Sequence, residues 1–344
     1  MKKGLMNRLA AAAVAGALLF GMAGCASQSS STSGASSASA DGELTPITVV
    51  LDYTPNTNHS GIYAAIDQGY YADAGLDVTV VQPPEDGADA LVASGRAQFG
   101  VSYQDWMANY IGSSNPLPVT AVAAILQHNT SGLISRAGDG ITTPSGLEGK
   151  RYGTLDVETE KAIVRTLVEE DGGSWEAVEV VPANSTDEIT GLRTDQFDAV
   201  WCFEGWAGQN AILQDFATDY FAVGDIDERF DYYTPVIIAN DAFLEEHPDT
   251  ARAFLAATAL GYEYAIEQPE EAAAILVAAA PEVDSDLALA SQLYLADKYQ
   301  ADAAQWGVFD ADRWNAFYAW MNEENLTEEP LPMDAGFTNE YLPE

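Results

Sequence analysis

The chain has 344 residues and a strongly acidic balance, with 53 Asp plus Glu against 14 Lys plus Arg and a formal net charge of −39 at pH 7. Nucleic-acid binding requires basic side chains that neutralise phosphates, and adhesion to anionic lipid requires basic clusters. The composition therefore excludes both functions, and we expect no nucleic-acid partner. We interpret the acidic surface mainly as a solubilising one.

The N-terminus predicts a secretory signal over residues 1–24. Basic residues within the first eight positions precede an apolar stretch, 9–23, that is too short to span a bilayer comfortably. Residues 22–25, Met-Ala-Gly-Cys, resemble a lipoprotein cleavage box. This resemblance implies lipidation of Cys25 and export, with the protein anchored in the membrane at the outer face of the cytoplasmic membrane. The alternative is a secreted protein that loses Cys25 with its signal.

Residues 25–43 are almost entirely Ser, Ala and Gly after the cysteine, a composition typical of a flexible tether. We expect the folded part to begin near Leu44. If Cys25 is lipidated, only Cys202 remains, so no intramolecular disulfide can form. Cys202 ends an apolar run and is expected to be a small buried side chain.

About 300 residues follow the tether, a length that suits two lobes better than one core. Short apolar runs alternate with helical patterns up to residue 240, which predicts doubly wound, mostly parallel α/β sheets. One helix is expected over 157–170 with Asp156 as its N-cap, and another over 186–193. The predicted strands are 47–53, 77–82, 98–102, 119–126, 151–154, 178–182, 197–203, 220–223 and 234–240.

After residue 240 the pattern becomes wholly helical, with apolar spacings of three and four. Only the short segment 336–341 is strand-like. The expected fold class is thus α/β with a helical C-terminal region. The predicted C-terminal helices are 249–267, 269–279, 284–300 and 311–325.

Three sequence motifs resemble the NMT1/THI5-like family. They are Pro-Asn-Thr-Asn-His-Ser-Gly at 55–61, Gly-Tyr-Tyr at 69–71 and Ser-Gly-Arg-Ala-Gln-Phe-Gly-Val at 94–101. The first motif is the more specific; the other two are shared with nitrate, sulfonate and taurine binders. Within the family, the chain is most similar to the group that binds thiamine pyrimidine precursors such as formylaminopyrimidine for ABC importers.

The resemblance implies a type II periplasmic-binding-protein fold with crossovers near 131–136 and 233–240. Lobe I would comprise 44–134 and 236–344, and lobe II would comprise 135–235. It also implies a monomer that captures a small-molecule aminopyrimidine, closes by hinge motion and delivers it to an ABC permease with a cytoplasmic ATPase.

Five loops follow the predicted strands and are expected to meet at the ligand cleft: 53–61, 102–106, 127–131, 154–158 and 204–206. They contain aromatic, amide and acidic residues, with His59 and His128 as the only potential cations. Because no Lys or Arg is present, anionic ligands are disfavoured and a flat, neutral or weakly basic heterocycle is favoured.

We predict that Glu204 accepts hydrogen bonds from the ligand's amine; the alternative is a surface or helix-capping role. Asn56 and His59 are predicted to hydrogen-bond the ligand or to stabilise their own loop. Whether Asp156 or His128 reaches the ligand stays open. Trp201 is expected to be a core residue. The side chains predicted to stack on the ligand, or else to pack in the core or rim, are Tyr53, Tyr103, Trp106, Trp206 and Tyr233.

An enzymatic alternative also follows from the resemblance, because the family includes pyrimidine synthases that consume pyridoxal phosphate and one of their own histidines. His59 falls at that position. The chain has no lysine in a cleft loop to hold such a cofactor, and Cys202 stands alone where the synthases carry several cysteines. We therefore predict a binding protein with no catalytic residue, cofactor or metal. Riboflavin and nitrate- or sulfonate-type ligands remain alternatives.

Overall fold

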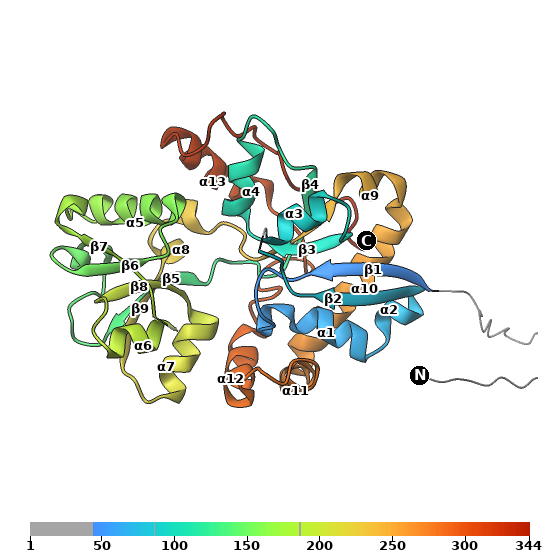
Figure 1. Cartoon of the computed structure of the whole chain (residues 1–344), viewed down its shortest axis with the longest axis horizontal. Coiled ribbons are helices and arrows are strands. Elements are labelled where there is room, and N and C mark those ends of the chain that lie inside the picture. The colour runs from blue at the N-terminus through green and yellow to red at the C-terminus, as the bar shows by residue number, and fades with distance from the viewer. Residues whose placement is uncertain (1–43, 86, 186) are drawn as a thin grey trace, which may run out of the picture. The chain divides into compact units, whose positions relative to one another are not determined.

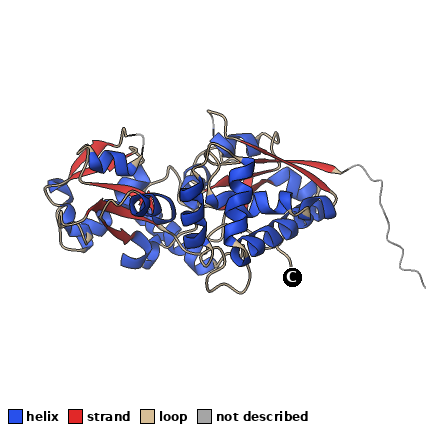
Figure 2. Cartoon of the chain, turned by 90° about the horizontal axis from the view of Figure 1, so that it is seen from below, coloured by secondary structure: helices blue, strands red, loops and turns tan. Residues whose placement is uncertain are grey.

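The computed structural model describes residues 44–85, 87–185 and 187–344. The predicted signal peptide, Cys25 and the tether lie outside the described residues. Within the described part, ten strands form two mixed five-stranded sheets with helices around them (Figures 1 and 2). The predicted α/β fold with mostly parallel sheets and a helical C-terminal region is confirmed.

The first sheet has the strand order β2-β1-β3-β10-β4, and the second has β7-β6-β8-β5-β9. One strand in each sheet, β10 or β5, is antiparallel to both of its neighbours. Each of these two strands is the first that the chain forms after it leaves the other sheet. The strands are β1 (Thr45–Val50), β2 (Leu76–Val81), β3 (Phe99–Ser102), β4 (Val119–Ala124), β5 (Ser131–Arg136), β6 (Arg151–Thr154), β7 (Glu179–Pro182), β8 (Ala199–Phe203), β9 (Thr218–Ala222) and β10 (Val236–Asn240).

The central strands are buried on both faces, which explains their continuous apolar sequences. Every residue of β3 and β10 is buried. In β1, Val50 packs in one apolar cluster with Val92, whereas Val49 packs in another with Ile62. Side chains alternate along a strand, so neighbouring residues point to opposite faces of the sheet. Accordingly α3 lies on one side of β1 and α1 on the other (Figure 1).

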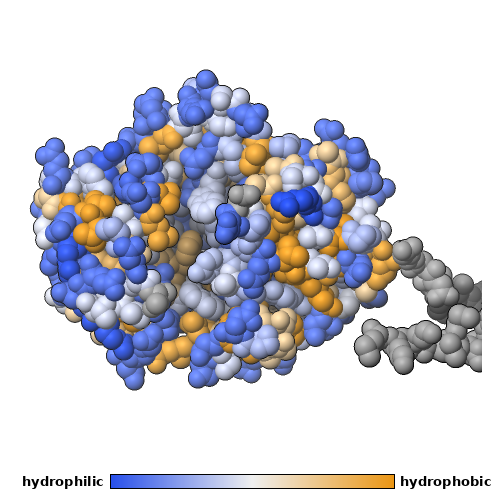
Figure 3. Space-filling model, in the orientation of Figure 1, coloured by the Kyte–Doolittle hydropathy of each residue, from blue (hydrophilic) through white to orange (hydrophobic). Residues whose placement is uncertain are grey.

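No helix in the described part of the chain is both long and apolar enough to cross a bilayer. The face shown in Figure 3 is mostly hydrophilic with scattered hydrophobic patches, as the acidic composition predicts. The helices are α1 (Ser60–Asp67), α2 (Tyr70–Asp73), α3 (Gly87–Ala93), α4 (Gln104–Ile111), α5 (Glu158–Glu170), α6 (Glu188–Arg193), α7 (Gln209–Leu213), α8 (Val223–Ile226), α9 (Asp241–Glu246), α10 (Pro248–Glu267), α11 (Pro269–Ala279), α12 (Ser285–Leu295) and α13 (Ala311–Glu323).

Four expectations need correction. The strand predicted over 47–53 ends at Val50, so the ligand loop begins earlier than expected, and the helix predicted over 284–300 ends at Leu295. Segment 336–341 forms no strand and contributes a single bridge to β4 through Phe337. Asp156 does not cap α5: it has a left-handed φ of 67°, and its side chain is ion-paired with Lys161.

Helices α1 and α10 pack at very close range. A Cβ added at Gly261 would lie 2.0 Å from the carbonyl oxygen of Gly61, and one added at Gly61 would lie 2.3 Å from the ring of Tyr262. Both positions therefore require glycine for the backbones to approach. This contact fixes the start of α1, directly after the loop that follows β1.

Candidate functional site

The main candidate site is a cavity of about 580 Å³, within the usual size range of small-ligand pockets. Each of the five predicted cleft loops contributes at least one lining residue. Four further residues, Ala183, Ser185, Asp187 and Glu188, also line the cavity and were not predicted to do so. The lining residues are Asp52, Tyr53, Thr54, Asn56, Thr57, Asn58, Tyr103, Thr130, Gly153, Leu155, Glu160, Ala183, Ser185, Asp187, Glu188, Val200, Trp201, Phe203, Gly205, Trp206 and Leu295.

The loop after β1 is held in place by residues that lie far along the chain, in α10, in α12 and in the turn after α12. The Tyr262 hydroxyl donates to the Asn58 carbonyl at 2.7 Å, and the Tyr299 hydroxyl donates to the Thr57 carbonyl at 2.7 Å. The Thr57 hydroxyl also lies 2.6 Å from the hydroxyl of Ser291. These bonds satisfy buried polar groups of an irregular segment, so the loop presents a fixed wall to the cavity.

Asn56 and His59 organise this loop from within. Asn56 is the N-cap of a short 3₁₀ turn, η1 (Thr57–His59), where its Oδ1 accepts from the Asn58 amide at 2.9 Å. Its Nδ2 donates to the Thr54 carbonyl at 3.0 Å. Asn56 therefore stabilises its own loop, which was one of its two predicted roles. It also lines the cavity.

His59 is fully buried and is not among the lining residues. Its Nδ1 accepts from the Asn56 backbone amide at 3.1 Å, so Nε2 carries the proton and donates to Asp52 Oδ1 at 2.6 Å. Both ring nitrogens are thus engaged inside the protein. The structure places His59 behind the cavity wall as a partner of Asp52.

Asp52 also lines the cavity, although it was not among the predicted site residues. Its side chain is only 4% exposed, and its Oδ2 accepts a hydrogen bond from the Tyr103 hydroxyl. Burial alone would raise the pKa of Asp52, but the contact with His59 and the hydrogen bonds from His59 and Tyr103 outweigh it and lower the pKa below its usual value. The carboxylate is thus ionised at neutral pH.

Aromatic side chains come to the cavity from both sheets. Tyr53 and Tyr103 follow strands of the first sheet, whereas Trp201 and Phe203 belong to β8 and Trp206 to the π-helical turn η4 (Glu204–Gly208). Trp201 was expected in the core. It is only partly buried and lines the cavity, because it lies on the face of β8 opposite to that of the buried Cys202.

Three more carboxylates line the cavity, and they lie in helix α5 and at the start of α6, beside the second sheet. Glu160 accepts a hydrogen bond from the Tyr152 hydroxyl, and Asp187 caps α6 by accepting from the Thr190 amide at 2.9 Å. Burial raises the pKa of Glu160 and also that of Glu188. In a chain with 53 acidic residues, nothing in the sequence distinguishes these positions.

The cavity is therefore acidic as well as aromatic. Among the described residues, four carboxylates and five aromatic side chains line it, and no Lys, Arg or His does. Carboxylates in a cavity that no described basic side chain lines favour ligands that donate hydrogen bonds or carry positive charge, and they repel anions.

Glu204, the predicted amine acceptor, is not among the lining residues. Its Oε2 accepts a hydrogen bond from the Tyr294 hydroxyl of α12, and Lys298 lies over the Tyr294 ring. A Cβ added at the adjacent Gly205 would lie nearest to Leu295, at 2.9 Å. The side chain that approaches closely at this point comes from α12.

Two predicted stacking residues also lie outside the cavity. Trp106 is 47% exposed and packs edge-on against Tyr103. Tyr233 is buried, and its hydroxyl accepts from the Asp310 amide at 2.7 Å. Both are aromatic residues near strand ends, but neither is among the residues that line the cavity.

The two residues whose ligand contact was left open are not lining residues either. Asp156 is exposed and ion-paired with Lys161. His128 lies between two carboxylates, with Nδ1 2.7 Å from Asp231 and Nε2 3.0 Å from Asp302. The hydrogen bond with Asp231 is the main reason that the pKa of His128 is raised.

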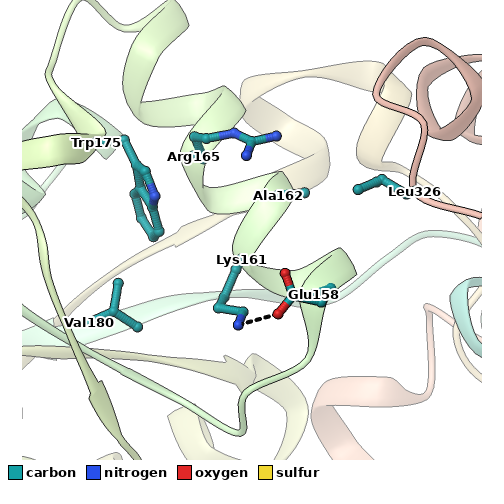
Figure 4. A pocket seen from close by; sticks show the side chains of 7 residues that line it. All are labelled: Glu158, Lys161, Ala162, Arg165, Trp175, Val180 and Leu326. Atoms are coloured by element: carbon teal, nitrogen blue, oxygen red, sulfur yellow. Dashed lines mark hydrogen bonds and ion pairs between the residues drawn. The ribbon is translucent and has the colours of Figure 1, made fainter.

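A second cavity, of about 360 Å³, lies beside α5 (Figure 4). Its basic residues already have carboxylate partners, since Lys161 is 2.5 Å from Glu158 and Arg165 is 2.7 Å from Glu324. It is smaller and has a single aromatic residue, Trp175. The described residues also include no group of His, Cys, Asp and Glu side chains suited to a metal ion.

The model of the "NMT1/THI5 like" family matches residues 56–272, well over half of the chain. The chain belongs to this family. The match begins at Asn56 and so includes most of the loop that lines the cavity. The family resemblance expected from the motif at 55–61 is confirmed.

Named proteins to which the chain is similar include a binding protein and several synthases. The chain is 28% identical over 318 residues to the formylaminopyrimidine-binding protein of Halalkalibacterium halodurans, covering 88% of this chain and 92% of that protein. It is 24% identical to the 4-amino-5-hydroxymethyl-2-methylpyrimidine phosphate synthase THI13 of Saccharomyces cerevisiae, covering 86% and 87%.

Among solved structures, the periplasmic aliphatic sulphonate-binding protein SsuA of Escherichia coli aligns with a TM-score of 0.67 at 11% identity. The alignment covers 85% of this chain and 97% of SsuA. This similarity establishes the periplasmic-binding-protein fold for the NMT1/THI5-like chain.

Proposed function

We propose that the protein is a solute receptor that binds a small planar nitrogen heterocycle carrying an amine, and that a thiamine-precursor aminopyrimidine is its ligand. The observation that carries this proposal is the cavity in which aromatic faces and carboxylates converge and to which no described Lys, Arg or His contributes. The 28% identity to a formylaminopyrimidine-binding protein over most of both chains supports the same ligand class.

The two kinds of lining residue match the two parts of such a ligand. A flat ring stacks on aromatic side chains, each contact contributing roughly 0.5 to 1.5 kcal/mol beyond burial. An exocyclic amine and a protonated ring nitrogen donate to carboxylates, and a hydrogen bond to a charged group contributes roughly 1.5 to 3 kcal/mol. Of the residues predicted to bind, Tyr53, Asn56, Tyr103 and Trp206 keep direct roles in this proposal.

A sulfonate or nitrate ligand fits this cavity poorly, although the fold is shared with a sulphonate-binding protein. An anion needs basic side chains or a free helix N-terminus. Here the start of α6 is occupied by the Asp187 side chain, and Glu188 follows it. An anionic ligand would meet repulsion from both.

The synthase alternative is also disfavoured by the local contacts of His59. A histidine that serves as a substrate must leave its partners, yet both nitrogens of His59 are engaged and the ring is fully buried. The cavity also offers no described lysine for a pyridoxal Schiff base. A larger planar ligand such as riboflavin remains the second candidate because a cavity of about 580 Å³ has room for one.

The physiological role that we propose is import. The signal sequence and Cys25 would place the receptor on the outer face of the cytoplasmic membrane, where it delivers its ligand to an ABC permease driven by a cytoplasmic ATPase. The predicted lobe boundaries, 44–134 with 236–344 and 135–235, would allow hinge closure around the ligand. Membrane localisation that persists in Cys25→Ala would contradict the lipid anchor.

Calorimetric titration of the purified protein tests the ligand class. The panel is formylaminomethylpyrimidine, hydroxymethylpyrimidine, thiamine, riboflavin and taurine. We expect one of the pyrimidines to bind with a submicromolar Kd and taurine not to bind. Tight binding of riboflavin or taurine alone would keep the receptor role and overturn the aminopyrimidine proposal.

A further inference from the structure

Asp52 differs from the other cavity carboxylates in how it is held. Its side chain is almost completely buried, yet it forms part of the cavity wall. One oxygen receives the Nε2–H of His59, and the other receives the hydroxyl of Tyr103. A carboxylate has about four acceptor positions, so these two bonds fix its orientation and leave capacity for further donors from the cavity.

The charge state of Asp52 also sets it apart. Its pKa is lowered by its donors, whereas burial raises the pKa of Glu160 and of Glu188. Of these three residues, Asp52 is the one whose donors outweigh the effect of burial and lower its pKa. A fixed anion in a buried wall is suited to recognise a specific N–H donor.

His59 maintains this arrangement without touching the cavity. The Asn56 backbone amide donates to Nδ1 at 3.1 Å, which fixes the tautomer with the proton on Nε2. That proton can only be directed at Asp52, 2.6 Å away. Asn56, in turn, is held by its capping interaction with Asn58. The motif at 55–61 thus acts as a support for the carboxylate three residues before it.

We propose that Asp52 is the carboxylate that selects the ligand's exocyclic amine, and that His59 is a positioning residue that acts only through Asp52. This inference rests on the proposed function and specifies its chemistry. The ligand would donate an amine N–H to Asp52. The corresponding pyrimidinone carries a carbonyl oxygen at the same ring position. This oxygen would face the carboxylate with no proton between the two acceptors, so the pyrimidinone would bind more weakly.

The test compares two ligands that differ at one ring position: 4-amino-5-hydroxymethyl-2-methylpyrimidine and its 4-oxo counterpart. Calorimetric titration gives the ratio of their Kd values for each variant. We expect the wild-type protein to prefer the amino compound by at least tenfold, the effect of one hydrogen bond to a charged group. Asp52→Asn should reduce this preference to less than threefold.

Two substitutions at His59 separate positioning from simple packing. His59→Gln retains an amide N–H that can donate to Asp52 and should keep at least a fivefold preference. His59→Leu fills the space without a donor and should lose most of the preference. If both variants behave alike, the positioning role is overturned.

Asp241→Asn provides a matched control, because Asp241 is a partly buried carboxylate that accepts a hydroxyl hydrogen bond, from Thr120 at 2.8 Å, outside the cavity. It should leave the preference unchanged. If Asp52→Asn fails to fold, Tyr103→Phe removes the second donor to Asp52 and should lower the preference at least threefold. A preference that survives both changes would overturn the inference.

The outcomes separate this inference from the function on which it rests. If the wild-type protein binds neither pyrimidine, the proposed function fails and the inference fails with it. If it binds both equally, or if the preference persists in Asp52→Asn, the receptor function stands and the role of Asp52 is overturned.

Discussion

At the residue scale, the site depends on which aromatic side chains point into the cavity. Trp206 lines it, whereas Trp106 packs outside against the edge of Tyr103. Trp206→Leu should therefore weaken aminopyrimidine binding about twofold to tenfold, the loss expected for one stacking contact. Tryptophan fluorescence titration measures this change. Trp106→Leu is the matched control and should alter the Kd less than twofold; equal losses in both variants would contradict the assignment.

His128 provides a residue-scale prediction about pH. Its hydrogen bond with Asp231 raises the pKa, so the charged form is favoured in the folded protein. The resulting stabilisation is complete below the usual pKa of about 6.5 and is lost as pH rises through the raised value. His128→Asn should lower the free energy of unfolding by about 0.5 kcal/mol at pH 5.5, since half-exposed ion pairs contribute little.

Chemical denaturation at pH 5.5 and pH 9 measures this difference, which should be smaller at pH 9. His247→Asn serves as the control, because His247 is exposed and has no ion pair among the described residues. A destabilisation by His128→Asn that is the same at both pH values would contradict the ion-pair explanation.

The sequence located the site loops but not all of the side chains that act there. The five loops were predictable because loops at the carboxyl ends of strands face the same edge of a sheet. The roles of His59 and Glu204 could not be predicted, because each depends on a hydrogen-bond partner. His59 pairs with Asp52, seven residues away, and Glu204 pairs with Tyr294, ninety residues away. Asp52 was not predicted as a site residue because the expected strand 47–53 included it, whereas β1 ends at Val50.

At the element scale, the contact between α1 and α10 determines where the ligand loop ends. Gly261→Ala would place a Cβ 2.0 Å from a backbone oxygen that cannot move aside. We expect a loss of about 1 to 3 kcal/mol in the free energy of unfolding, despite the better helix propensity of alanine. Ligand affinity should fall as well, because the displaced α1 carries the loop with it.

Leu260→Ala is the neighbouring control on the exposed face of α10, and it should change the free energy of unfolding by less than about 0.5 kcal/mol. Chemical denaturation compares the two variants. A Gly261→Ala protein as stable as the wild type would show that the helices are not in close contact.

Elements were more predictable than their ends. Strand β6 was predicted at its observed bounds, as was α11, whose initial proline is a local signal. The end of β1 could not be predicted from local sequence, because it depends on pairing with other strands. Val50 still pairs with β2 and β3, whereas Asp52 and Tyr53, which were predicted to continue the strand, line the cavity. Segment 336–341 alternates like a strand but has a single bridging partner.

At the scale of the whole molecule, the net charge of −39 implies strong self-repulsion in the folded state. Salt screens this repulsion, with a Debye length that falls from about 30 Å at 0.01 M to about 3 Å at 1 M. Raising NaCl from 20 mM to 500 mM should therefore increase the Tm by at least about 2 °C. Differential scanning calorimetry measures the shift, and a Tm that falls with salt would indicate that attractive ion pairs dominate instead.

The central claim is that the cavity lined by both sheets holds an aminopyrimidine. A crystal structure of the protein with the tightest pyrimidine ligand tests it most directly. We predict that the ring lies against Tyr103 or Trp206 and that its exocyclic amine is within hydrogen-bond distance of a cavity carboxylate. A ligand bound elsewhere, such as the cavity beside α5, or a ring whose amine faces no carboxylate, would contradict the account.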